Sequence, residues 1–135
     1  QLQRMLWSYE ARNVDERKLL DDMIQTWPMP VNPLLITDVN ERIVGVNSTW
    51  VHMCKFSHEE AFGHTPKILQ GPLTNVETAR NFSSTLRGGK AGFASLINYK
   101  KDGSLFLNHI YGWYVGDLLV AETYIEELLA PTEPQ

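Results

Sequence analysis

The chain has 135 residues, a length that suits one domain with flanking segments and leaves too little for two comfortable ones. With 43% hydrophobic and 21% charged residues its composition is that of a globular protein, and no apolar run approaches the roughly 18 residues that span a bilayer. Twelve Lys and Arg against sixteen Asp and Glu give a net charge of -4, with no dense basic patch. We therefore expect no membrane insertion and no direct nucleic-acid contact by this segment.

The single cysteine, Cys54, excludes an internal disulfide. The first residues show no basic stretch followed by an apolar one, as a secretory signal would. We expect an intracellular protein, cytoplasmic or nuclear, and we expect this segment to be one part of a larger regulatory protein.

Residues 1–31 are expected to form a flanking amphipathic helix, or two short ones. Apolar residues recur there at three- and four-residue spacings, as one helix face requires. The polar stretch between two apolar groups predicts a break near Asn13, with Asp15 as a helix cap, and Pro28 and Pro30 end the helix. The spaced apolar residues are Leu2, Met5, Leu6, Tyr9, Leu20, Met23, Ile24 and Trp27.

From Asn32 the pattern changes to short β-prone runs. LLITD and RIVGVN read as two antiparallel strands joined by a turn at VNER. Ser48 is expected to cap a short helix, and the capping box SHEE predicts another that begins after Ser57. A longer helix, VETARNFSSTLR, is expected to begin after Asn75.

Three further β-prone runs follow: GFASLINY, SLFLNHIYGWYV and LLVAETYI, the last two joined by a turn at Gly116 and Asp117. The sequence therefore predicts an α+β fold in which a five-stranded antiparallel sheet carries short helices on one face. The core is expected to cover residues 32–126, and the polar, Pro-rich residues 127–135 to form a tail or linker.

The segment GHTPKILQG, residues 63–71, aligns without a gap with the G-x-N-C-R-F-L-Q-G signature of LOV domains. These form a PAS subfamily that binds flavin mononucleotide (FMN) and senses blue light. The I-N-Y and F-x-N strand motifs of that family follow in register in LINYKKDGSLFLN. The resemblance covers roughly residues 32–125 and implies a PAS fold of LOV-like type. It says less about function, because function lies in the site.

The resemblance implies a partly retained flavin site. Gln70, Asn98 and Asn108 match family residues that hydrogen-bond the flavin ring, and each amide offers both donors and an acceptor. Each also has an ordinary explanation, the two asparagines as partners of buried polar groups and Gln70 as the cap of a short helix that begins at Pro66. Pro66 stands where the family has its photochemical cysteine and offers no nucleophile, so no cysteinyl-flavin adduct forms there. Cys54 lies on another segment, and we interpret it as a small buried hydrophobe.

The resemblance also implies an altered phosphate end. Lys67 replaces one family arginine, Ser83 replaces a second, and Thr65 replaces an asparagine. Two arginines would hold a phosphate with forked, charge-assisted hydrogen bonds, so their replacement should weaken FMN binding substantially. On the last strand a family glutamine aligns with Thr123 or with its neighbour Glu122. We therefore expect that the domain binds no cofactor, with FMN as the alternative.

No catalytic or metal site is expected. The four histidines lack the i, i+4 spacing of a helical metal pair, and no cysteine or carboxylate cluster joins them. No serine or cysteine has an identifiable base partner, so the sequence indicates no enzyme. The histidines are His52, His58, His64 and His109.

The predicted strands carry more large apolar residues than one interior face needs, so part of the sheet must be covered. The N-terminal helix has an apolar stripe suited to this, either over its own sheet or over that of a partner protomer. The residues expected at such an interface are Leu6, Leu20, Met23, Ile24, Trp27, Tyr99 and Trp113.

Two functional hypotheses follow. The first is a non-catalytic PAS signalling module without cysteinyl-flavin photochemistry, which forms homodimers or heterodimers, or binds partners, within a larger regulatory protein. The alternative is a cysteine-less sensor of light or redox state. It would bind flavin or another small planar ligand through Gln70, Asn98 and Asn108, with Trp and Tyr residues as electron donors.

Overall fold

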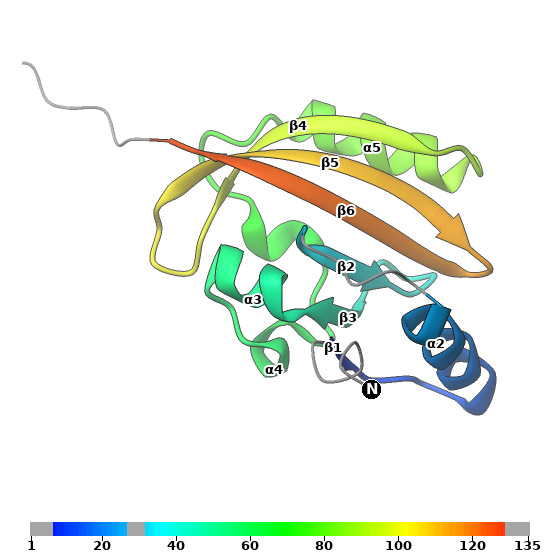
Figure 1. Cartoon of the computed structure of the whole chain (residues 1–135). Coiled ribbons are helices and arrows are strands. Elements are labelled where there is room, and N and C mark those ends of the chain that lie inside the picture. The colour runs from blue at the N-terminus through cyan, green and yellow to red at the C-terminus, as the bar shows by residue number, and fades with distance from the viewer. Residues whose placement is uncertain (1–6, 27–31, 129–135) are drawn as a thin grey trace, which may run out of the picture.

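A six-stranded antiparallel sheet is the central element of the structure, a computed structural model that describes residues 7–26 and 32–128 (Figure 1). The strand order is β1-β3-β2-β6-β5-β4, so β1 and β4 form the two edges. The strands are β1 (Trp7–Tyr9), β2 (Leu34–Thr37), β3 (Ile43–Asn47), β4 (Gly92–Tyr99), β5 (Leu105–Val115) and β6 (Leu118–Glu127). The prediction of an α+β fold with an antiparallel sheet is confirmed, with one strand more than expected.

The additional strand, β1, lies in the segment that we expected to be helical. Trp7 pairs with Asn47 and Tyr9 with Gly45, so β1 extends the sheet beyond β3. Trp7 is buried, although the local spacing of apolar residues fitted a helix. The helical prediction was wrong for Trp7–Tyr9, because pairing with a distant strand decided their conformation. Leu2, Met5 and Leu6, from the same predicted stripe, lie outside the described residues.

Helix α2 (Val14–Thr26) follows the predicted break at Asn13. The Asn13 side chain accepts a hydrogen bond from the Glu16 backbone N–H at 2.8 Å, so Asn13 and not Asp15 caps the helix. The sequence left open whether this helix covers its own sheet or a partner's. In the structure it covers its own sheet, since Leu20 and Ile24 are 0% exposed within this chain.

The remaining helices lie on the opposite face of the sheet from α2. They are α3 (Ser48–Cys54), α4 (His58–Ala61), the 3-10 helix η1 (Pro66–Leu69) and α5 (Val76–Arg87). The capping box at Ser57 and the cap at Asn75 form as predicted. Helix α3 is capped by Asn47, not by Ser48. The Asn47 side chain accepts from both the Trp50 and Leu34 backbone N–H groups, so it joins α3 to β2.

Two apolar cores lie on either side of the sheet because neighbouring strand residues point to opposite faces. Leu34 and Ile36 pack beneath α2, whereas Leu35 packs with Trp50 and Phe106 on the other side. The α2 side is a cluster of Trp7, Leu20, Met23, Ile24, Leu34, Ile36, Val44, Leu118 and Val120.

The C-terminal strands form the predicted hairpin, with Val115 opposite Leu118 and a turn at Gly116 and Asp117. Gly116 has a φ of 59°, and a Cβ there would lie 3.0 Å from the Leu19 side chain of α2. Strand β6 runs to Glu127, and residues 129–135 of the expected tail lie outside the described ones. Within residues 7–26 and 32–128, no helix has the length and apolar character required to cross a membrane.

Candidate functional site

A cavity of about 370 Å³ lies between the sheet, α5 and η1. Its volume is in the range of small-molecule sites, which run from roughly 300 to 1,000 Å³. Apolar side chains form much of its wall and polar groups converge from several elements. The wall includes Leu35, Trp50, Leu69, Val76, Ala79, Phe82, Leu86, Leu96, Ile110, Leu119 and Ala121.

The structure brings all the residues predicted for a flavin site to the wall of this cavity. They come from three strands of the sheet and from the segment around η1, which are far apart in the sequence. They are Thr65, Pro66, Lys67, Gln70, Asn98, Asn108 and Thr123.

Three polar side chains form a hydrogen-bonded row across β6, β5 and β4. The Thr123 hydroxyl donates to Asn108 Oδ1, and Asn108 Nδ2 donates to Asn98 Oδ1 at 2.9 Å. Asn98 Nδ2 donates to the Ile97 carbonyl oxygen at 3.2 Å. All three side chains are buried. An amide NH₂ has two protons, so each asparagine keeps a second donor for a ligand in the cavity.

Alternation along β6 brings only one of the two residues aligned with the family's glutamine to the cavity. Thr123 lines the cavity, whereas Glu122, its neighbour along the strand, does not. The row of Thr123, Asn108 and Asn98 gives the inner face of the sheet a polar stripe. The apolar residues Leu96 and Ile110 lie on the same cavity wall.

The η1 segment supplies the opposite part of the wall. Thr65 caps η1 by accepting from the Lys67 backbone N–H at 3.4 Å, and Pro66 occupies its first turn, where a missing N–H costs nothing. The Gln70 backbone N–H donates to the Lys67 carbonyl at the end of η1. The capping role expected for Gln70 is therefore performed by its backbone, while its side chain lines the cavity.

Cys54 does not line the cavity and lies on α3, in the core that contains Trp50 and Phe106. It is fully buried, and this burial raises the pKa of its thiol to about 11. A thiol with so high a pKa is almost wholly protonated near neutral pH and is a poor nucleophile. The structure thus supports its interpretation as a buried apolar residue.

The sequence reasoning missed the charged side chains where the cavity opens. Arg80 and Arg87 of α5 line it, together with Glu41 from the β2–β3 turn. Arg87 Nη1 lies 3.0 Å from Glu41 Oε1. The spacing of the arginines around Ser83, three and four residues away, is the sequence signal that would have found them.

The predicted interface residues lie in different places. Leu20, Met23 and Ile24 pack in the chain's own core, so α2 does not present them to a partner. Trp113 is partly buried against the same core. Tyr99, expected on the open sheet, instead packs against the loop after η1, where its hydroxyl accepts from the Leu73 backbone N–H at 2.9 Å. Leu6 and Trp27 lie outside the described residues.

Exposed aromatic side chains remain on the outer face of β4, β5 and β6, beyond the part that α2 covers. Phe93 is 61% exposed, Tyr111 49% and Tyr124 55%. His109 stacks on Tyr124 at 4.5 Å between ring centroids and hydrogen-bonds Ser95 and Glu126. We refer to Phe93, His109, Tyr111 and Tyr124 as the outer aromatic patch.

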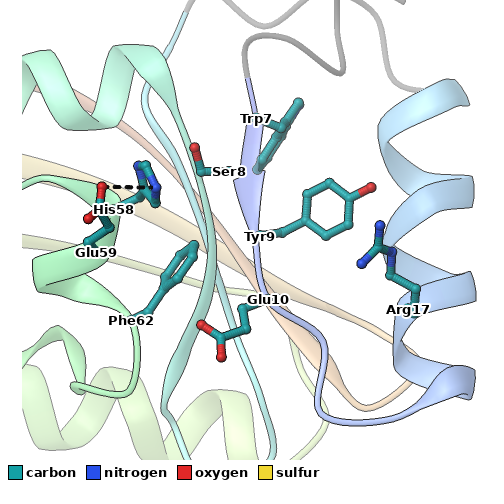
Figure 2. A pocket seen from close by; sticks show the side chains of 8 residues that line it. All are labelled: Trp7, Ser8, Tyr9, Glu10, Arg17, His58, Glu59 and Phe62. Atoms are coloured by element: carbon teal, nitrogen blue, oxygen red, sulfur yellow. Dashed lines mark ion pairs between the residues drawn. The ribbon is translucent and has the colours of Figure 1, made fainter.

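A second hollow, of about 640 Å³, surrounds β1 (Figure 2). Arg17 of α2 lies 5.1 Å above the Tyr9 ring on one side, and His58 and Phe62 line the other. The exposed Glu10 and Glu59 also line it, so it is an open groove and not an enclosed site. Despite its greater volume, the groove lacks the buried polar row that distinguishes the inner cavity.

Metal-binding groups do not gather in the part of the chain that the structure describes, where no three His, Cys, Asp or Glu side chains could hold an ion. His52 and His64 are exposed. His58 contacts Glu59 at 3.6 Å, and His109 belongs to the outer aromatic patch.

Comparison with known proteins points to sensory and regulatory relatives. The chain is 30% identical over 95 residues to the bacterioopsin transcriptional activator of Halobacterium salinarum, covering 70% of this chain and 14% of that protein. It is 24% identical over 107 residues to a blue-light-activated histidine kinase of Rhizobium johnstonii, covering 77% of this chain and 30% of the kinase. The chain thus spans less than a third of either relative. No family model matches it.

Solved structures share the architecture at low sequence identity. The LOV domain of the Erythrobacter litoralis EL346 blue-light-activated histidine kinase superposes with a TM-score of 0.69 at 20% identity, over 73% of this chain and 99% of that one. A light-oxygen-voltage domain studied with a flavin analogue superposes with a TM-score of 0.69 at 20% identity, over 82% and 85%.

The fold is that of PAS domains. Within that class the likeness is to LOV domains in both sequence and structure, so the resemblance inferred from GHTPKILQG is confirmed.

The expectation that no cofactor binds was wrong. LOV homologues carry a flavin chromophore, and one of the superposed domains was studied with a flavin analogue. That expectation rested largely on the replacement of two family arginines by Lys67 and Ser83. In the structure the cavity and its amide row are intact.

Proposed function

We propose that this domain is a sensory module of LOV-like type that holds FMN in the inner cavity and responds without a bond between a cysteine and the flavin. The observation that carries this proposal is the buried row of Thr123, Asn108 and Asn98 on the wall of a cavity of about 370 Å³. A planar ring with alternating donors and acceptors along one edge, such as a flavin, suits two amides with unused capacity.

Different residues of the cavity would contact different parts of the flavin. Asn98, Asn108 and Gln70 would orient the polar edge of the ring, while the apolar side chains of the cavity wall, among them Leu96 and Ile110, would pack against it and exclude water. When bound, the flavin supplies absorption of blue light and the capacity to accept electrons. The proposal assigns no catalytic residue to this segment.

The absence of adduct chemistry follows from where the sulfur lies. Cys54 is the single cysteine of the chain, and it lies in the α3 core and not on the cavity wall. Pro66, which lines the cavity at the family's cysteine position, carries no nucleophile. A response would therefore depend on changes in hydrogen bonding around the ring, which the row from Thr123 to Asn98 would carry across the sheet.

Signal output is proposed to use the outer aromatic patch. Large exposed aromatic side chains that gather on one face are typical of protein interfaces. We infer that this face forms a dimer or binds another part of a larger regulatory protein, with residues 32–126 as the sensory core and residues 1–31 as its flanking segment.

Illumination of flavin-loaded protein tests the proposal. Wild type and Cys54→Ala should respond identically, because the buried thiol takes no part. Pro66→Cys brings a thiol to the cavity wall and should lose blue absorption under illumination, which recovers in the dark. A light response of the wild type that disappears in Cys54→Ala would contradict the proposal.

A further inference from the structure

A serine, a histidine and a glutamate form a hydrogen-bonded series on the outer face of the sheet. Ser95 Oγ lies 2.8 Å from His109 Nδ1, and His109 Nε2 lies 3.1 Å from Glu126 Oε1. The three residues come from β4, β5 and β6, which are neighbours in the sheet (Figure 1). Because strands carry all three side chains, their relative positions are well defined.

The two hydrogen bonds fix the state of the imidazole. A carboxylate only accepts hydrogen bonds, so His109 Nε2 carries the proton and donates to Glu126. Nδ1 then keeps its lone pair and accepts from the Ser95 hydroxyl. A hydroxyl held by an imidazole that a carboxylate orients is the arrangement that activates serine as a nucleophile.

The histidine is held in place while the serine oxygen stays accessible. The His109 ring lies between Tyr124 and Phe93, with ring centroids 4.5 Å and 6.4 Å away. Its side chain is 13% exposed, whereas Ser95 is exposed. The base is therefore positioned by packing, and a substrate can reach the hydroxyl from solvent.

The backbone N–H of Ser95 points away from the sheet at the free edge of β4. Inside the β4–β5 hairpin the Lys100 N–H donates to the Ser104 carbonyl, and from outside the Thr74 hydroxyl donates to the Ile97 carbonyl. Backbone groups alternate along a strand, so Ser95, two residues before Ile97, also directs its N–H outward. Within residues 7–26 and 32–128 no strand pairs with this edge. This N–H can therefore donate to an oxyanion that develops beside Ser95.

We propose that Ser95, His109 and Glu126 form a hydrolytic site for small esters. Ser95 is the nucleophile, His109 is the general base, and Glu126 is a positioning residue that orients the imidazole. Phe93, two residues before Ser95 on the same face, is 61% exposed and offers an apolar surface to the leaving group. The site therefore favours esters of aromatic alcohols, and it acts independently of a flavin in the inner cavity.

The reaction needs only the ester and water. Ser95 Oγ forms a bond to the ester carbonyl carbon as its proton passes to His109 Nδ1. The bond between that carbon and the alcohol oxygen then breaks, and the proton leaves with the alcohol. A water molecule repeats the two steps on the acylated Ser95, which releases the carboxylic acid and restores the hydroxyl.

Hydrolysis of 4-nitrophenyl acetate tests the site, followed by the colour of the released nitrophenolate. Ser95→Ala and His109→Ala should each lower the rate at least about tenfold. Glu126→Gln should lower kcat and leave KM unchanged, because Glu126 acts through the imidazole and does not touch the ester. Because Phe93 and His109 belong to the outer aromatic patch, the assay uses dilute protein shown to be monomeric by sedimentation.

Two variants serve as matched controls. Ser84→Ala removes an exposed serine of α5, and His52→Ala removes an exposed histidine of α3. Both should keep the wild-type rate. Since Ser95 is itself exposed, Ser95→Ala should fold normally, which circular dichroism checks.

Covalent labelling identifies the nucleophile directly. A fluorophosphonate probe should form a P–O bond to Ser95 with loss of fluoride, and mass spectrometry of the digested protein locates the adduct. An unlabelled Ser95, or hydrolysis that is equally fast in wild type and Ser95→Ala, would overturn the hydrolytic site. Either result would leave the proposed flavin-binding function standing, because that function concerns the opposite face of the sheet.

Discussion

The side-chain amide of Asn108 donates to the side-chain oxygen of Asn98 at 2.9 Å, which joins β5 to β4 within the buried wall of the cavity. Two asparagines on an inner sheet face would be costly if they were unsatisfied, because a buried polar group without a partner loses its hydration. Their mutual bond lowers this cost and fixes the orientation of both amides. The cavity wall therefore carries polar groups of fixed orientation that a ligand could bind.

Substitution of either asparagine should weaken flavin binding. Asn98→Ala and Asn108→Ala each remove an amide that faces the ligand, and we expect about a tenfold loss of affinity from one hydrogen bond. Asn108→Ala should have the larger effect, because it also leaves Thr123 and Asn98 without their shared partner. Calorimetric titration measures this loss.

The control for these variants is Asn81→Ala, an exposed asparagine of α5 that does not line the cavity. Unchanged affinity in both cavity variants, with the fold intact by circular dichroism, would show that the amide row does not hold the ring.

Cys54 should make stability fall at alkaline pH. Burial raises its pKa to about 11 from an ordinary value of 9.0. Between these values the unfolded chain releases the thiol proton while the folded chain keeps it, so the free energy of unfolding falls as pH rises. The fall is about 1.4 kcal/mol per pH unit at most.

Urea unfolding at a series of pH values, on wild type and on Cys54→Ala, isolates this contribution. The variant is less stable at neutral pH because it leaves a small cavity. Its stability should fall less steeply above pH 9. Parallel curves for the two proteins would mean that the thiol ionises as easily in the folded chain as in the unfolded one.

Gly71→Ala should destabilise the loop that follows η1. A Cβ at this position would lie 2.4 Å from the Tyr99 ring, so the ring must move and release the Leu73 N–H that it holds. We expect a loss of about 1–3 kcal/mol in the free energy of unfolding, as for other overpacked sites.

The double variant Gly71→Ala, Tyr99→Ala separates the clash from the intrinsic effect of the alanine. Relief of the clash should make Gly71→Ala nearly neutral in the Tyr99→Ala background. If Gly71→Ala lowers the free energy of unfolding equally with Tyr99 present and in the Tyr99→Ala background, the destabilisation does not come from a clash with the Tyr99 ring.

The outer aromatic patch should control self-association. Tyr124→Glu puts a charge among exposed aromatic rings, so a dimer formed through this face should dissociate to monomer in sedimentation experiments. Val14→Glu, on the exposed side of α2, is the control. A dimer that survives Tyr124→Glu would place the interface on another surface.

Ile24→Asp tests the position of α2 and not a dimer contact. Ile24 is fully buried against the chain's own sheet, so an aspartate there should lower the free energy of unfolding by several kcal/mol, of the order expected for a buried unpaired charge. Unchanged stability with loss of a dimer would instead mean that α2 packs on a partner.

Local signals in the sequence predicted much of the fold. The capping box at Ser57, the cap at Asn75 and the turn at Gly116 depend on neighbouring residues, and each forms as expected. The family motif implied that Asn98 and Asn108 face a ligand site, and both line the cavity.

Features that depend on distant contacts escaped the sequence analysis. Strand β1 forms because Trp7–Tyr9 find an edge at β3, and no local pattern encodes that pairing. Arg80 and Arg87 reach the cavity only when α5 is placed over the sheet. The alignment with the family concerned Ser83 alone, whereas Arg80 and Arg87 lie about one helix turn before and after it.

The absorption spectrum of the purified protein, recorded after incubation with excess FMN and removal of free ligand, tests the central claim most directly. We predict a structured flavin band in the blue that survives desalting and is diminished in Asn108→Ala. A colourless wild-type protein after the same treatment would contradict the account of the cavity as a flavin site.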